Sequence, residues 1–117
     1  MTIWPTRSVE EQGTLSLWSW QVLELPDGDR HLIGYCMENR EGRVSSAVVE
    51  LDLENLRATT NSGRVYLLIG ASGNNLDANY VWGRWTQQLS IQMWNDVSDS
   101  VWQEHLARND GKPKNNR

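Results

Sequence analysis

The chain has 117 residues and a mass of 13.4 kDa, which fits a single domain because domains typically run ~100–150 residues. Hydrophobic residues make up 38% and charged residues 22%, a composition that excludes a disordered chain, and no apolar run approaches the ~18–20 residues of a membrane span. The N-terminus has no basic stretch followed by an apolar segment, so we expect no secretory signal, no membrane contact and a cytoplasmic location.

Charge divides the chain into two parts. Residues 1–107 hold seven Arg and no Lys against fourteen acidic residues, a net charge of −7, whereas residues 108–117 hold four basic residues and one acid, a net charge of +3. An acidic body repels phosphate backbones, so nucleic acid is an unlikely partner. We predict one domain over residues 1–107 and a flexible basic tail over residues 108–117.

Turn signals divide the first seventy residues into segments of strand length. Glycine-containing turns are predicted at residues 26–29, 40–43 and 61–64. Between them lie five predicted strands: Thr14–Leu25, Arg30–Glu38, Val44–Leu53, Leu56–Thr60 and Val65–Gly70. Their spacing is typical of an antiparallel β-meander.

Two of these strands carry a pattern that tells which side chains face the core. In the third strand, Ala47, Val49, Leu51 and Leu53 alternate with acidic residues, which predicts one buried and one solvated face. In the first strand the apolar residues shift from odd positions, ending at Leu17, to even positions, beginning at Trp18. Either a β-bulge or burial on both faces of the strand would explain this shift.

The pattern after Gly70 is helical. Five apolar residues fall within about 100° of arc at 3.6 residues per turn, and they are Ala78, Val81, Trp82, Trp85 and Leu89. Asn74 or Asn75 is the expected N-cap, and a second helix is predicted over Asp99–Arg108, capped by Asp96 or Ser98. Strands followed by helices indicate an α+β fold, with about five antiparallel strands and both C-terminal helices packed on one face.

The loop between the last strand and the first helix is a candidate anion site. Backbone N–H groups of such a loop can bind an anion, and the residues concerned are Gly70, Ser72, Gly73, Asn74 and Asn75. The loop matches neither the phosphate-binding nor the nucleophile motifs of known enzymes, so a strand exit followed by a helix cap is the competing interpretation.

Other polar side chains give little support for catalysis. Glu50, Asp52 and Glu54 are spaced for two-carboxylate chemistry, but their alternation with apolar residues also describes a solvated strand face. His31 and His105 lack partners at metal-ligand spacing, and the lone Cys36 is interpreted as a buried structural thiol. We therefore expect no catalytic residue, no metal and no cofactor.

Aromatic residues supply the candidate protein-binding surface. The chain has seven Trp and no Phe, so most tryptophans must form the core, but the parity of Trp18 and Trp20 also allows an outer face. Leu76, Tyr80 and Arg84 form a strip on the first helix opposite its apolar stripe, and Trp, Tyr and Arg are enriched at interfaces. A homodimer is an open possibility, since a sheet has two edges.

Three stretches of the sequence carry a resemblance to known proteins: Glu38–Ser46, Ser62–Gly70, and Asp77–Trp82 followed by Trp85. They resemble a group of small uncharacterised proteins of proteobacterial genomes and their mobile elements, and the likeness covers residues 18–100. The group has prolines after the position of Gly70, where this chain has Ala71 and Ser72. The resemblance transfers no catalytic residue, and it implies an adaptor or an inhibitor of a host system.

These observations predict a non-enzymatic intracellular module that binds a protein partner. The residues expected to bind are Leu76, Tyr80, Arg84, Trp18 and Trp20. The alternative is a small-molecule or anion-binding domain that uses the Gly70–Asn75 loop. A third hypothesis, an enzyme built on the strand carboxylates, requires Glu50 and Asp52 to line a cleft.

Overall fold

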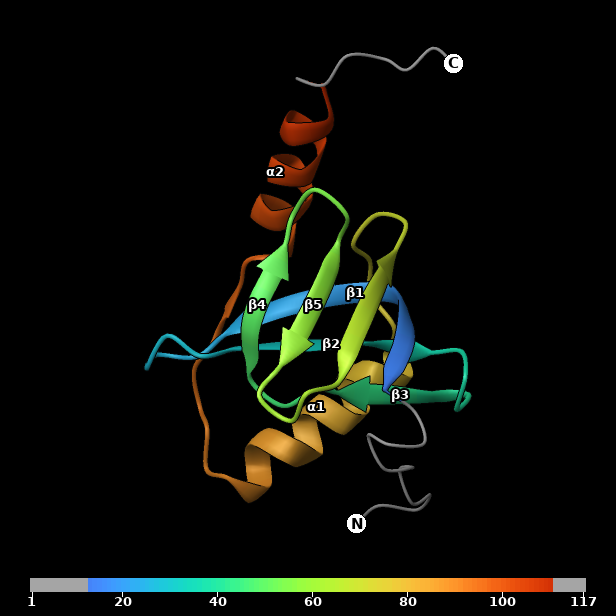
Figure 1. Ribbon diagram of the computed structural model, residues 1–117. Coiled ribbons are helices and arrows are strands. Elements are labelled where there is room, and N and C mark those ends of the chain that lie inside the picture. Colours follow the sequence, from blue (N-terminus) through green and yellow to red (C-terminus); the bar gives the residue numbers. More distant parts are fainter. Residues whose placement is uncertain (1–12, 111–117) are drawn as a thin grey trace.

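The computed structural model describes residues 13–110 and has an α+β architecture (Figure 1), which confirms the predicted fold class. The strands are β1 (Thr14–Glu24), β2 (Arg30–Cys36), β3 (Glu41–Val44), β4 (Val48–Asp52), β5 (Arg57–Thr60), β6 (Val65–Ile69) and β7 (Asn95–Asp96). The helices are α1 (Leu76–Gln88) and α2 (Ser98–Asp110).

The topology of the sheet corrects the predicted antiparallel meander of about five strands. Within residues 13–110 the sheet has seven strands, in the order β3-β2-β1-β6-β5-β4 with β7 beside β1. Within this sheet β1 and β6 run parallel, and their pairing extends from Thr14 opposite Val65 to Trp18 opposite Ile69. Two antiparallel meanders, β1-β2-β3 and β4-β5-β6, are thus joined through one parallel pair.

A short connection forces this sheet to curl. Residues 45–47 link β3 to β4, which lie at opposite ends of the strand order. In a flat sheet these two strands would be about 24 Å apart at ~4.8 Å per strand, whereas the chain from Val44 to Val48 spans at most ~14 Å. The sheet therefore folds over itself, and β4, β5 and β6 cross in front of β1 and β2 in Figure 1.

A β-bulge in β1 resolves the change of parity in the first strand. The register of β1 against β2 shifts between Trp18 and Gln21, and Ser19 has a positive φ of 51°. Before the bulge the odd-numbered residues face the main core, and after it the even-numbered ones do, so Trp20 joins Leu17 in the core. The β-bulge, one of the two explanations expected for this strand, is therefore confirmed.

A second bulge overturns part of the pattern expected for the third strand. The pairing of β4 with β5 shifts between Val48 and Glu50. Val48, Leu51 and Leu53 pack against the core, but the side chain of Val49 is 64% exposed. The prediction that Val49 faces the core is therefore wrong, because strict alternation does not survive a bulge.

On the side of β1 where β6 ends, the second half of the strand is paired by β7 and by the loops before α1 and α2. The amide of Gly73 donates to the carbonyl of Trp20 at 3.0 Å, and the amide of Val97 donates to the carbonyl of Val22 at 2.9 Å. The amide of Val22 in turn donates to Oγ of Ser98 at 2.8 Å. Buried backbone groups need such partners, so these bonds fix the positions of the loops before α1 and α2.

The core consists of two clusters on opposite faces of the β1–β2 pair. Val22 and Leu32 belong to the main cluster between the halves of the curled sheet, whereas their neighbours Leu23 and Ile33 belong to a smaller cluster beneath α1. The main cluster also receives Val101 from α2. The two helices therefore pack on opposite faces, which corrects the prediction that both lie on one face.

The segment expected to form a turn around Gly42 is strand β3 instead. The turn lies one step earlier, at residues 37–40, and Arg40 adopts a positive φ of 54° there. Gly42 is buried because α1 passes directly over it, and a Cβ at this position would collide with the backbone of Asp77. The glycine is required by the close approach of a helix rather than by a turn.

The second helix is longer than expected. It begins at Ser98, whose amide donates to the carboxylate of Asp96 at 2.9 Å, and it continues through Arg108 to Asp110. Arg108 forms an ion pair with Glu104 at 3.2 Å within this helix, so residues 108–110 of the predicted tail are helical. The remainder of the predicted tail, residues 111–117, lies outside the described residues, as does Trp4.

Candidate functional site

Helix α1 has one buried and one exposed face, which the sequence pattern predicts well. Its N-cap is Asn75, whose side chain accepts a hydrogen bond from the amide of Ala78 at 2.9 Å, as is typical of Asn at this position. The residues that pack into the smaller cluster are Ala78 and Trp82, with Trp85 half-buried beside them. Leu89, expected on the same stripe, is exposed because it already forms the C-cap.

Several aromatic rings hold α1 on the sheet. The rings of Trp82 and Trp85 stack with centroids 5.1 Å apart, and the edge of Trp94 meets Trp82 at 5.4 Å. His31 of β2 lies 4.7 Å from Trp85, and its Nδ1 is 2.9 Å from the carbonyl oxygen of Ser45. These contacts give α1 a fixed orientation, so its outer face is presented rigidly.

The outer face of α1 carries the predicted strip. Leu76 is 80% exposed and Tyr80 is 66% exposed, although both are large side chains, and Arg84 is exposed one turn further along. Nη1 of Arg84 lies 3.5 Å from the hydroxyl of Tyr80, a weak contact. We call Leu76, Tyr80, Gly83 and Arg84 the α1 crest.

Gly83 is a member of the crest that the sequence prediction missed. It stands in the interior of α1, where glycine lowers helix stability by about 0.5–1 kcal/mol relative to alanine. Apart from its chain neighbours and the backbone of its own helix, a Cβ built at Gly83 meets no atom within 4 Å, in contrast to Gly42. The sequence itself shows this residue, because an isolated glycine within a helical pattern is tolerated but lowers the stability of the helix.

The two tryptophans predicted to bind a partner have different environments. Trp20 is 0% exposed, and its Nε1–H donates to the carbonyl oxygen of Gly70 at 2.9 Å. Trp18, on the other side of the bulge, is 46% exposed. Trp20 is thus a core residue and is removed from the candidate surface, while Trp18 stays a candidate.

Many polar groups of the Gly70–Asn75 loop already form hydrogen bonds within the chain. The Gly73 amide and the Asn75 side chain are engaged as described above, and Oδ1 of Asn74 accepts a hydrogen bond from Nδ2 of Asn79 at 2.6 Å. Gly70 accepts the indole proton of Trp20. Ser72 is half-buried. This geometry favours the interpretation of a strand exit followed by a helix cap over that of an anion site.

The strand carboxylates do not line up as paired catalytic groups. Glu50 is exposed, and Glu54 lies exposed in the turn after β4. The carboxylate of Asp52 closes that turn by accepting hydrogen bonds from the amides of Glu54 at 3.1 Å and Asn55 at 3.2 Å. His105, nearby, has its Nδ1 2.7 Å from the carbonyl oxygen of Leu53, which fixes α2 to the same turn.

Cys36 is buried in the main cluster, as predicted. Burial raises the pKa of its thiol, so little reactive thiolate forms near neutral pH. We therefore expect iodoacetamide to alkylate Cys36 slower in the native protein than in 8 M urea by roughly tenfold or more, as followed by mass spectrometry. Equal rates in the two conditions would contradict the burial of this thiol.

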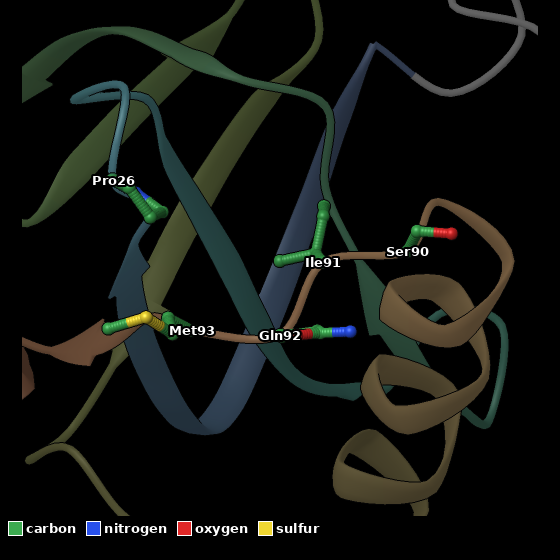
Figure 2. Close-up of a pocket in the computed structure, with 5 residues that line it drawn as sticks. All are labelled: Pro26, Ser90, Ile91, Gln92 and Met93. Atoms are coloured by element: carbon green, nitrogen blue, oxygen red, sulfur yellow. The ribbon is translucent and has the colours of Figure 1, made fainter.

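A shallow hollow lies at the C-terminal end of α1, away from the Gly70–Asn75 loop. Figure 2 shows Pro26 in the β1–β2 turn and Ser90–Met93 in the segment that follows α1. The hollow has a volume of about 280 Å³ and is open to solvent. This size falls just below the ~300–1,000 Å³ of typical ligand pockets, so it does not favour a small-molecule site.

Among residues 13–110, no cluster of three or more His, Cys, Asp or Glu side chains is arranged to hold a metal ion. In the same part of the chain, no helix is both long and apolar enough to span a membrane. No family model matches the sequence, and no curated protein or solved structure matches it either. The functional argument therefore depends on the geometry described above.

Proposed function

We propose that this chain is a non-enzymatic protein-binding module whose binding surface is the α1 crest. The single observation that carries the proposal is the exposure of Leu76 and Tyr80 on a helix whose opposite face is fixed in the core by Trp82. Large apolar and aromatic side chains beside an arginine have the composition of interface anchors. The resemblance to mobile-element proteins favours an adaptor or an inhibitor among such modules.

Trp18 is a second contact residue in this proposal. It lies on β1 in register with Tyr35 of β2 and Ile69 of β6, both of which are half-buried. These three side chains project from neighbouring strands on the face that α1 partly covers, since Gly42 continues the same row and touches Asp77 of α1. An apolar row at the foot of the helix extends the surface available to a partner.

The decisive variant is Tyr80→Ala/Arg84→Ala. Because both side chains are exposed, the variant is expected to keep its fold, with a change in the free energy of unfolding within about 0.5 kcal/mol. The immobilised wild-type chain is used to capture proteins from an extract of the cells that encode it, and a captured protein is then purified for titration calorimetry. Loss of two interface anchors is expected to raise its Kd by roughly 30-fold or more.

Arg57→Ala provides the matched control, because Arg57 is an exposed arginine on β5, away from α1. The control is expected to bind as the wild type does. If the double variant were to bind the same protein with unchanged Kd, the α1 crest would not be the binding surface. If no protein bound the crest, the Gly70–Asn75 loop would become the better candidate, to be tested by thermal shift with inorganic phosphate.

A further inference from the structure

The α1 crest is complementary to itself. Tyr80, its largest side chain, stands three residues before Gly83, which has no side chain. Apart from the chain neighbours of Gly83 and the backbone of its own helix, no described atom lies within 4 Å of the position of a Cβ there. Residues three apart lie on the same helix surface. The protruding ring of Tyr80 therefore lies beside a stretch of helix surface at Gly83 that no side chain covers.

Gly83 has no explanation within the described chain. Glycine in the interior of a helix costs stability, and a compensating close contact is found for Gly42, where the backbone of Asp77 leaves no room for a Cβ. No such contact exists at Gly83 among residues 13–110. A close approach of another molecule to the backbone at this position would supply the reason.

The charges on the same helix show how that molecule is oriented. Asp77 and Arg84 are seven residues apart, so they lie within about 20° of each other around the axis, on one flank of the crest. In an antiparallel pair of identical helices, residues of the same flank meet across the interface. A two-fold axis between positions 80 and 83 then brings Arg84 of each copy within about 3 Å, along the axis, of Asp77 of the other.

We propose that the partner of the α1 crest is a second copy of this chain, paired antiparallel through α1. Tyr80 of each copy packs over Gly83 of the other, and two equivalent Arg84–Asp77 ion pairs flank this contact. Such an isologous contact is the commonest form of homodimer. A parallel pair is disfavoured because it brings opposite flanks of the two helices together and separates Arg84 from Asp77 by about 10 Å along the axis, so neither ion pair forms. The inference rests on the proposed role of the crest as a protein-binding surface.

The first test is charge reversal, measured by sedimentation velocity of the full chain over a range of concentrations. Asp77→Arg alone and Arg84→Asp alone each place like charges across the interface, and each is expected to raise the dimer dissociation constant by roughly tenfold or more. The double variant Asp77→Arg/Arg84→Asp restores opposite charges and is expected to return to within about threefold of the wild type. Circular dichroism verifies that every variant is folded.

The second test is Gly83→Ala, which separates dimerisation from folding. The added methyl group fills the gap that receives Tyr80 of the other copy, so the dimer is expected to weaken although the helix itself is favoured. A wild-type chain that stays monomeric at millimolar concentration would overturn the proposal. So would a dimer that both single charge reversals and Gly83→Ala leave unchanged.

These outcomes are distinct from failure of the proposed function. If the chain is monomeric but Tyr80→Ala/Arg84→Ala still abolishes binding of a different protein, the crest is a binding surface for that protein and the second copy is the wrong partner. If neither self-association nor capture of another protein depends on the crest, both proposals fail. Arg57→Ala serves again as the control, with an unchanged dissociation constant expected.

Discussion

Replacing Trp20 with alanine is expected to destabilise the protein by about 3–5 kcal/mol, a large part of the roughly 5–15 kcal/mol that holds a domain of this size folded. The indole has no exposed surface and fills the centre of the main cluster. Its removal leaves a cavity and deprives the carbonyl of Gly70 of its hydrogen-bond donor. The free energy of unfolding is measured by urea denaturation followed by circular dichroism.

Trp18→Ala is the matched comparison. The same substitution is made two residues away in the same strand, but Trp18 is about half exposed, so we expect a loss of only about 1 kcal/mol. Trp20→Phe tests mainly the hydrogen bond to Gly70, because it keeps much of the ring volume while it removes the indole N–H. Similar losses at Trp18 and Trp20 would show that the β1 bulge does not place the two side chains in different environments.

Parity alone could not have separated these two tryptophans. Residues 18 and 20 share a face in any regular strand, and the sequence pattern correctly indicated that regularity fails near this point. What it left open was the side of the bulge on which each tryptophan lies. The left-handed backbone of Ser19 decides this, and serine carries no strong signal for that conformation.

The parallel pairing of β1 with β6 could not be predicted from the sequence for a different reason. Turn signals describe connections between neighbouring segments, and they correctly located the turns at Gly28 and Gly63, which both have positive φ. The contact between Thr14 and Val65 joins segments 51 residues apart in the sequence. This pairing depends on the closure of the curled sheet and on the short link over residues 45–47. Local sequence patterns therefore cannot predict it.

The candidate site was more predictable than the sheet. The exposure of Leu76, Tyr80 and Arg84 follows from helical phase, which is a local property, and Asn75 was one of two expected caps. The prediction missed Gly83 because it searched for binding residues among large side chains, and glycine has no side chain. It also left Asp77 out of the strip, although its position seven residues before Arg84 relates it to the same surface.

Gly42→Ala is expected to destabilise the protein by about 1–3 kcal/mol or more, because the added methyl group would occupy the space of the Asp77 backbone. A flexible side chain could move aside, but a helix backbone cannot do so without displacing α1. The crest is carried by this helix, so binding through the crest is expected to weaken together with stability. Thermal and urea denaturation give the change in stability.

The opposite sign is expected for the same substitution at Gly83. Among residues 13–110, no atom outside the neighbouring residues and the backbone of α1 itself lies within 4 Å of the added methyl group. Alanine favours the helix by about 0.5–1 kcal/mol, so Gly83→Ala is expected to raise the free energy of unfolding. If Gly42→Ala proved neutral, α1 would not rest on β3 as closely as described. If Gly83→Ala stabilised the fold while it weakened self-association, the reason for glycine at this position would be clear. Glycine would lower the stability of the single chain but allow a second copy to pack against α1.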